Sequence, residues 1–183
     1  MPFEDNSFDA IYQIEATAHA PSKEGVYAEI FRVLKPGGVF GSYEWCLTDK
    51  YDAENAKHKE IKKGIEIGNA LPDIATCEAV VAAEEAVGFE VLHQEDRGIM
   101  LTDQEYAWYH PLTPALTPSR IQYYGIGHKV MITGVSLMEK IGFYPPGTVG
   151  VQEFLRAASL NLVLGGQEGI FTPSFFTLCR KPE

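Results

Sequence analysis

The sequence predicts an α/β protein in which a parallel sheet is followed by a helical segment and one more strand. Three observations indicate this class. Residues 8–46 follow the order strand, amphipathic helix, glycine-rich turn and strand, the βαβ pattern of parallel strands. Residues 53–95 add two helical patterns and a third strand. Over residues 100–144 the alternation of strand and helix stops, and an aromatic-rich stretch predicts an inserted helical subdomain.

The first strand, helix and strand follow from apolar spacing and turn residues. Ile11, Tyr12 and Ile14 predict a short buried strand within residues 8–16. Ser22 is a candidate N-cap, because its side chain can accept from a free backbone N–H of the next helix. That helix has apolar residues at helical spacing and stops at a turn: Val26, Ile30, Val33 and Leu34, then Pro36-Gly37-Gly38. Residues 39–46 are apolar enough for a central strand.

The same signals predict the rest of the chain. Helices are expected over residues 53–68 and 76–87, and a third strand over 89–95. After the aromatic-rich stretch, an amphipathic helix that ends at Gly165-Gly166 is predicted from the spacing of Val151, Phe154, Leu155, Ala158 and Leu162. Residues 171–179 predict a final strand, which we expect to pair antiparallel at the edge of the sheet.

Composition excludes several classes of function. The chain has 183 residues and a formal net charge of −10 without a cluster of Lys and Arg, so we expect no nucleic-acid partner. Three cysteines without zinc-type spacing predict neither a disulfide framework nor a metal site. No apolar run approaches the ~20 residues that span a bilayer. We therefore expect a soluble or peripheral intracellular protein.

No glycine-rich loop of the kind that follows the first strand of a nucleotide-binding α/β domain comes before this βαβ unit. Two motifs suggest why. Pro2-Phe3-Glu4-Asp5-Asn6-Ser7-Phe8-Asp9 resembles the approach to the fourth strand of class I methyltransferases. Leu34-Lys35-Pro36-Gly37-Gly38 is similar to their turn into the fifth strand. Both motifs are common to many such enzymes, so they indicate a fold and a cofactor but no substrate.

Three further motifs are more specific. Ile14-Glu15-Ala16-Thr17-Ala18-His19-Ala20-Pro21 is similar to a signature of sterol 24-C-methyltransferases, with Ala18 where that family usually has Cys. Tyr43-Glu44-Trp45 and Trp108-Tyr109-His110-Pro111-Leu112 resemble later segments of the same family. The resemblance covers nearly the whole chain.

The resemblance implies the C-terminal part of a class I methyltransferase (Rossmann-like) sheet, with the first strands missing and a helical substrate-binding insertion. Residues 1–99 would be the C-terminal half of the methyltransferase domain, 100–170 the sterol-binding insertion, and 171–183 the sheet-edge strand and tail. A sheet ordered 3-2-1-4-5-7-6 that lacks its first three strands leaves one side of the fourth strand, residues 11–16, exposed.

The implied reaction transfers a methyl group from S-adenosylmethionine to the C24 alkene carbon of a Δ24 sterol side chain, a reaction that needs no metal. Glu15 and His19 follow the fourth strand, where open α/β sheets bind ligands. Glu15 is a candidate for backing the cofactor or a developing positive charge, and His19 for a base or a positioning residue. The alternatives are a helix-capping Glu15 and a hydrogen-bonded loop histidine.

Tyr43, Glu44 and Trp45 end the fifth strand beside the same crevice. Alternation puts Tyr43 and Trp45 on one face of the sheet and Glu44 on the other. An aromatic pair suits a cation–π pocket, although packing in the core is the better interpretation for Tyr43. Glu44 is a candidate proton acceptor if burial raises its pKa, or else the partner of a lysine.

The remaining candidates concern the contacts to the cofactor and to the sterol. Phe3, Glu15 and Ala16 are the expected cofactor contacts, in a pocket that this chain leaves incomplete. Trp108 and Tyr109 are expected to bind the sterol. Further candidates for the sterol wall also suit the core of the insertion itself: Tyr123, Tyr124, Met131 and Met138.

The resemblance also implies peripheral association with the endoplasmic reticulum or lipid droplets, and a homo-oligomer in the complete protein. Two alternatives to the sterol enzyme stay open. One is a non-catalytic lipid-binding or oligomerisation module derived from it, and the other is a related isoprenoid C-methyltransferase.

Overall fold

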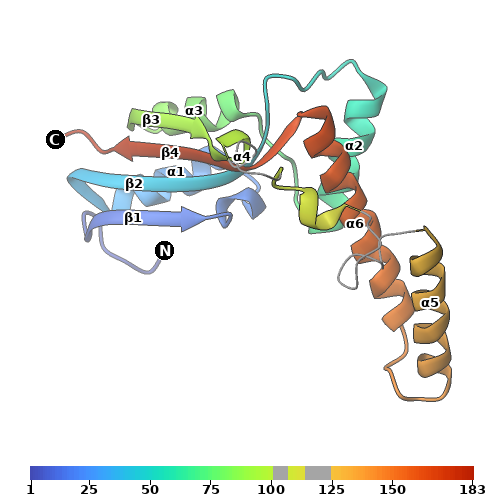
Figure 1. The fold of residues 1–183 in the computed structure, drawn as a ribbon. Coiled ribbons are helices and arrows are strands. Elements are labelled where there is room, and N and C mark those ends of the chain that lie inside the picture. Colours follow the sequence, from blue (N-terminus) through green and yellow to red (C-terminus); the bar gives the residue numbers. More distant parts are fainter. Residues whose placement is uncertain (101–106, 114–124) are drawn as a thin grey trace.

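A computed structural model describes residues 1–100, 107–113 and 125–183 of the chain (Figure 1). Its described residues form one mixed sheet in the order β1-β2-β4-β3. β1 and β2 are parallel, whereas β4 is antiparallel to both of its neighbours. The strands are β1 (Phe8–Ile14), β2 (Leu34–Leu47), β3 (Glu90–Asp96) and β4 (Phe171–Arg180).

The helices fall into two groups (Figure 1). α1 and α3 pack together beside the sheet, whereas α2, α5 and α6 lie beyond its end. The bounds are η1 (Thr17–His19), α1 (Lys23–Val33), α2 (Ala56–Asn69), α3 (Cys77–Ala86), α4 (Arg97–Met100), η3 (His110–Leu112), α5 (Gly125–Lys140) and α6 (Thr148–Glu168).

The predicted βαβ unit is confirmed by the parallel pairing of β1 and β2 across α1. The predicted N-cap is also confirmed, because Ser22 Oγ accepts a hydrogen bond of 3.0 Å from the Gly25 backbone N–H. The helices expected over 53–68 and 76–87 are present as α2 and α3, which begin slightly later than predicted, at Ala56 and Cys77.

The final strand is antiparallel, as predicted, but its expected place at the sheet edge is wrong. β4 lies between β2 and β3, so that Leu178 pairs with Gly41 on one side and His93 on the other. β3 forms the edge instead. This arrangement suits the side chains, because β4 has buried residues throughout its length while β3 exposes Glu90 and His93 to solvent.

β1 forms the opposite edge, and no described strand pairs with its outer side. Tyr12 is 80% exposed and Ile14 is 61% exposed, so the prediction that both side chains are buried is wrong. The observed order corresponds to strands 4-5-7-6 of the expected sheet. Exposure of Tyr12 and Ile14 therefore agrees with the expected open side of the fourth strand.

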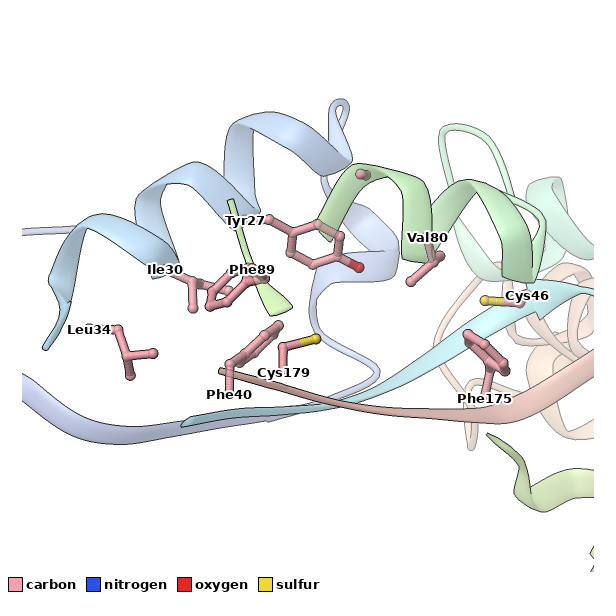
Figure 2. Close-up of a cluster of buried hydrophobic side chains, with 10 residues drawn as sticks. Tyr27, Ile30, Leu34, Phe40, Cys46, Val80, Phe89, Phe175 and Cys179 are labelled. Atoms are coloured by element: carbon pink, nitrogen blue, oxygen red, sulfur yellow. The ribbon is translucent and has the colours of Figure 1, made fainter. Parts of the chain in front are cut away.

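The main core lies between the sheet and the pair α1 and α3 (Figure 2). Phe40 from β2 contacts the rings of Tyr27 and Phe89 at centroid distances of 6.0 and 5.7 Å. Tyr27 and Phe40 are fully buried. Full burial of one large apolar side chain contributes roughly 1.5–3 kcal/mol, so this cluster holds the two helices on one face of the sheet.

Two polar features lie inside this core. Glu84 on α3 is fully buried and its Oε1 accepts a 2.6 Å hydrogen bond from Thr177 Oγ1. Burial raises the pKa of Glu84 from 4.5 to about 7. The neighbouring Cys77 thiol and burial hold the pKa of Cys46 well above its usual range, and Cys46, Cys77 and Cys179 are all free.

α6 is longer than predicted, because Gly165-Gly166 lies inside it and Gly169 ends it in a left-handed conformation. Close packing against α2 explains Gly165, because a Cβ there would lie 3.0 Å from Ile65 Cδ1. The reverse contact is as close, since a Cβ on Gly68 of α2 would lie 2.6 Å from Ala158 Cβ. α6 therefore joins the insertion to α2, while the boundaries of the three predicted segments stay predictions.

Candidate functional site

A small cavity lies at the carboxyl ends of β1 and β2, against the end of α2. Its volume is about 130 Å³. Three residues proposed from the sequence line it together: Glu15, His19 and Trp45. The cavity is also lined by Ala18, by Asn69 at the end of α2 and by Leu71, which follows α2. The location agrees with the expectation that ligands bind beyond the carboxyl ends of parallel strands.

The backbone at Glu15 turns the chain away from the sheet. Its N–H donates to the Tyr43 carbonyl at 2.8 Å, which continues the β1–β2 ladder by one residue. Its φ of 57° is in the left-handed region, a conformation that costs a non-glycine residue roughly 1–2 kcal/mol. The turn leaves the Glu15 side chain exposed at the cavity and starts η1, which ends at His19.

A buried glutamine holds this turn, and sequence reasoning missed it. Gln13 Oε1 accepts from the Ala16 N–H at 2.8 Å, and its amide nitrogen donates to the Tyr43 carbonyl at 3.0 Å. The same nitrogen donates to Glu44 Oε1 at 3.1 Å. The only sequence signal was an amide in the middle of an apolar strand, where a buried polar group needs partners.

Glu44 lies on the opposite face of the sheet from Tyr43 and Trp45, as alternation predicts, and it is fully buried. Its Oε2 pairs with Lys23 Nζ at 3.0 Å, and its Oε1 accepts from the Tyr27 hydroxyl at 3.2 Å. Burial raises the pKa of Glu44, while the Lys23 ammonium opposes that rise. These contacts make Glu44 a lysine partner, and its catalytic role stays a prediction.

His19 and Trp45 have contrasting surroundings. The His19 ring is exposed, with Nδ1 at 3.4 Å from the Ala70 carbonyl oxygen. Trp45 is half-buried and meets the Phe171 ring edge-on at 5.4 Å. Its buried indole nitrogen has no hydrogen-bond partner in the described part of the chain. An imidazole that can exchange protons and an aromatic face thus share one cavity.

Three other predicted residues do not line this cavity. Tyr43 packs on Phe176 at 4.9 Å, which supports the packing interpretation. Phe3 packs on Phe8 at 5.0 Å, at the end of β1 farthest from Glu15. Seven residues at about 3.3 Å each separate the two ends of that strand, so Phe3 and Glu15 are not brought together. Ala16 is exposed, and its N–H is held by Gln13.

A second cavity of about 320 Å³ contains Trp108 and Tyr109. The two cavities are joined by four rings in contact, which we call the aromatic wall: Trp45, Phe171, Trp108 and Tyr109. Trp108 meets Phe171 at 5.7 Å and Tyr109 at 5.4 Å. Neither cavity is lined by Met131 or Met138 on α5, and Tyr123 and Tyr124 lie outside the described residues.

Replacing Gly166 by valine is expected to displace the end of the aromatic wall. A Cβ at this position would lie 2.1 Å from Tyr109 Cδ1 and 2.9 Å from Trp108 Cζ2. The clash should lower the free energy of unfolding by about 1–3 kcal/mol and shift tryptophan emission to longer wavelength as Trp108 is exposed. Gly134→Val on α5 is the control, because no atom lies within 4 Å of its Cβ position. Equal effects of both variants would contradict the prediction.

No group of three or more His, Cys, Asp or Glu side chains is placed to hold a metal ion among residues 1–100, 107–113 and 125–183. Within the same ranges, no helix combines the length and the apolar character needed to span a bilayer.

Comparison with protein families gives two matches. Residues 119–183 match the C-terminal domain of sterol methyltransferases, and residues 1–41 match a methyltransferase domain. The whole chain is 46% identical to cycloartenol-C-24-methyltransferase 1 of Oryza sativa subsp. japonica and 47% identical to sterol 24-C-methyltransferase of Yarrowia lipolytica. It covers 52% and 50% of these proteins, so the chain spans about half the length of the curated relatives it matches.

Solved structures support the fold. A putative sarcosine dimethylglycine methyltransferase from Galdieria sulphuraria matches the whole chain with a TM-score of 0.62 and 22% identity, over 56% of its own length. A geranyl diphosphate methyltransferase, solved with geranyl diphosphate and sinefungin, matches 99% of the chain with a TM-score of 0.59 and 13% identity, over 49% of its own length. Both are methyltransferases, which confirms the predicted fold class.

Proposed function

We propose that this chain is a member of the sterol methyltransferase family and the C-terminal half of an enzyme that methylates C24 of a Δ24 sterol with S-adenosylmethionine. One observation carries the proposal: Glu15, His19 and Trp45, drawn from separate parts of the family-like motifs, meet at one cavity. The aromatic wall extends from that cavity toward α6 and offers a long apolar ligand a continuous surface.

The described residues fit one side of the cofactor. Glu15 is exposed beside the open edge of β1, where a cationic sulfonium compound could lie against its carboxylate. A cavity of about 130 Å³ cannot enclose such a compound, so this chain supplies one wall of the pocket. When bound, S-adenosylmethionine supplies the methyl group to the alkene.

The protein's own residues would do three things around the reacting carbons. The Trp45 ring presents a π face to the positive charge that develops on the sterol side chain, an interaction worth up to ~2 kcal/mol when desolvated. Phe171 of the aromatic wall and Leu71, which belongs to the same apolar cluster, exclude water that would trap that charge. His19 is placed to accept a proton.

A chimeric enzyme tests the proposal. Residues 1–183 would replace the matching C-terminal half of the Yarrowia lipolytica enzyme, and radiolabelled methyl transfer to a Δ24 sterol would be measured. We expect turnover, with kcat lowered about 10²-fold or more by His19→Ala. The Glu24→Gln chimera, changed at an exposed helix residue of this chain, should match the unaltered chimera. A chimera that folds but transfers no methyl group would contradict the proposal.

We further propose that the outer parts of α5 and α6 contact a lipid surface, where the sterol is dissolved. Exposed apolar side chains cover this hairpin, which extends away from the sheet (Figure 1): Ile126, Val130, Leu137, Ile141, Phe143, Val151, Phe154 and Leu155. Its acids are engaged internally, since Glu139 accepts from two backbone N–H groups and Glu153 pairs with His128. Lys129 and Lys140 stay exposed, which suits anionic lipid.

Vesicle sedimentation tests the lipid contact. The chain should co-sediment with phosphatidylcholine vesicles that contain phosphatidylserine, and Phe143→Ser should weaken the binding. Tyr12→Ser, which alters an equally exposed ring on β1, should not. If the chain does not co-sediment with vesicles but forms a dimer in sedimentation velocity, the hairpin is instead a contact within a homo-oligomer. In cells, we expect fluorescently tagged protein on the endoplasmic reticulum or on lipid droplets.

A further inference from the structure

Helix α2 is followed by a residue in the left-handed conformation. Ala70 has φ 53° and ψ 40°, values that glycine adopts freely but that cost a residue with a Cβ free energy. Glu15 is left-handed as well, and it lines the smaller cavity. Both neighbours of Ala70, namely Asn69 and Leu71, line the same cavity. Two such residues at one cavity indicate a functional reason, because strained backbone is retained mainly where a site depends on it.

The bend at Ala70 closes the helix with N–H groups and turns a carbonyl outward. The Ala70 N–H donates to the Ile67 carbonyl at 3.4 Å. The Leu71 N–H donates to the Glu66 carbonyl at 2.9 Å, which completes the pattern of a Schellman cap. The Ala70 carbonyl is not part of that pattern, and its oxygen lies 3.4 Å from His19 Nδ1. The helix end therefore presents a backbone acceptor to the imidazole.

The two chain segments that meet here are anchored in one apolar cluster. Ala18 precedes His19 and is 6% exposed. Leu71 follows Ala70 and is 8% exposed. Both anchoring side chains belong to the same buried cluster. The imidazole and the carbonyl are thus held near each other by buried neighbours, although His19 and Ala70 are themselves exposed.

A carbonyl partner determines which ring nitrogen of His19 carries the hydrogen. A carbonyl oxygen can only accept, so the nitrogen that faces it, Nδ1, must be the donor. Neutral imidazole has one N–H, so Nε2 then has the lone pair that can take a proton. The separation of 3.4 Å is long for such a bond, as catalytic hydrogen bonds often are before the substrate binds. The contact therefore selects the tautomer in which Nε2 is the base.

Other histidines of the chain have a different kind of partner. His93 lies 3.2 Å and His128 lies 2.9 Å from a glutamate oxygen. No carboxylate in the described ranges makes an ion pair with His19. A paired carboxylate favours imidazolium, which has no lone pair and cannot act as a base. A carbonyl orients the ring without adding a charge.

We propose that the Ala70 carbonyl is the positioning group of His19, which it holds in the Nδ1–H tautomer so that Nε2 removes the proton from the methylated sterol cation. The inference rests on the proposed function and names the atom that acts as base. In this step the C–H electron pair next to the cationic carbon becomes the new alkene bond, and the proton passes to Nε2. The imidazolium that forms still donates its Nδ1 hydrogen to Ala70.

Nitrogen NMR of the chain tests the tautomer directly. The chain would carry isotope-labelled histidine and be titrated to alkaline pH until the ring signals stop moving. His19→Gln assigns the His19 signal among the five histidines of the sequence. Neutral histidine in water favours the Nε2–H form. We expect His19 to differ, with its hydrogen on Nδ1.

Two variants at Ala70 and a matched control relate the tautomer to the bend. Ala70→Val should return His19 largely to the Nε2–H form, because a β-branched residue disfavours positive φ and turns the carbonyl away. Ala70→Gly adopts the bend readily and should keep the Nδ1–H form. Ala56→Val, at the exposed first residue of the same helix, should also keep it. Circular dichroism confirms that each variant is folded.

Kinetics of the chimera test the role of the nitrogen. Ala70→Val should lower kcat about tenfold and leave KM for the sterol unchanged. The loss is smaller than for His19→Ala, because the released ring still adopts the productive tautomer part of the time. Added to His19→Ala, Ala70→Val should cause no further loss, since the carbonyl acts only through the ring. A merely structural effect of the valine would lower turnover in both backgrounds.

Several results would overturn the assignment. They are an Nε2–H form of His19 in the unaltered chain, a tautomer that Ala70→Val leaves unchanged, or losses of kcat that add in full in the double variant. The proposed function fails separately. A chimera without methyl transfer, together with an Nδ1–H form that Ala70→Val abolishes, would remove the reaction and its base but keep the orienting contact.

Discussion

Replacing Glu44 by leucine should lower the free energy of unfolding by about 3–5 kcal/mol, because it leaves a charged partner buried without compensation. Lys23 Nζ lies 3.0 Å from Glu44 Oε2, and the two side chains are only 12% and 1% exposed. The Tyr27 hydroxyl and the Gln13 amide would lose the same acceptor. Urea unfolding monitored by circular dichroism measures the change.

A double variant serves as the control. In Glu44→Leu with Lys23→Met, no charge remains in the pair, so much of the lost stability should return, as it does when apolar residues replace a buried ion pair. If the double variant is as unstable as Glu44→Leu alone, the unpaired lysine is not the cause of the loss.

Glu44→Gln separates stability from catalysis. An amide still accepts from Tyr27 and leaves only the charge of Lys23 uncompensated, so this chimera should stay folded. If Glu44 only supports the turn that carries Glu15 and His19, the variant should keep most of the turnover and the pH profile of the parent chimera. Loss of turnover with an intact fold would restore the sequence-based assignment of Glu44 as a proton acceptor.

Replacing Glu84 by glutamine should remove a pH dependence of stability. Burial raises the pKa of Glu84 from 4.5 to about 7, with smaller contributions from the charges of Glu44 and Glu85. Between these two values the folded state binds more protons than the unfolded state, so stability is greatest below pH 4.5 and falls as pH rises to 7. The full effect is on the order of 3 kcal/mol at 1.36 kcal/mol per pKa unit.

The comparison is made with two variants at several pH values. Glu84→Gln keeps an acceptor for Thr177 and should gain most over the unaltered chain at pH 8, and little at pH 4.5. Glu85→Gln changes an exposed neighbour on the same helix, whose charge contributes least to the pKa of Glu84, and should change the pH dependence of stability only slightly. If the unaltered chain and Glu84→Gln have parallel stability curves between pH 4.5 and 8, Glu84 titrates normally.

The order of secondary-structure elements could be predicted because each boundary has a local chemical cause. Ser22 caps α1 through its own hydroxyl, and the turn at Gly37, whose φ is 75°, lies between α1 and the apolar part of β2. The resemblance of the motifs then supplied the strand order. Glu15, His19 and Trp45 could be placed together because strand ends in a parallel sheet meet at one edge.

Long-range contacts explain what the sequence could not predict. The side chain of Gln13 holds a turn three residues away through partners on another strand, which no local pattern indicates. Gly166 resembled a helix stop, yet it is internal because Tyr109, distant in sequence, needs the space. Phe3 belongs to a motif that resembles a cofactor-binding loop, but it lies at the start of β1 against Phe8. The length of β1 separates Phe3 from Glu15, and the motif alone does not show this separation.

The interior position of β4 has a consequence for how the protein is made. β4 is translated after every other described element, yet it lies between β2 and β3 and pairs with both. β2 and β3 do not pair with each other directly. Until residues 171–180 leave the ribosome, β3 has no partner strand and the hydrophobic side chains of α3 lack Phe175 and Cys179 beneath them. Completion of the sheet is therefore a late, non-local step, and nascent chains should depend on chaperones until that step is finished.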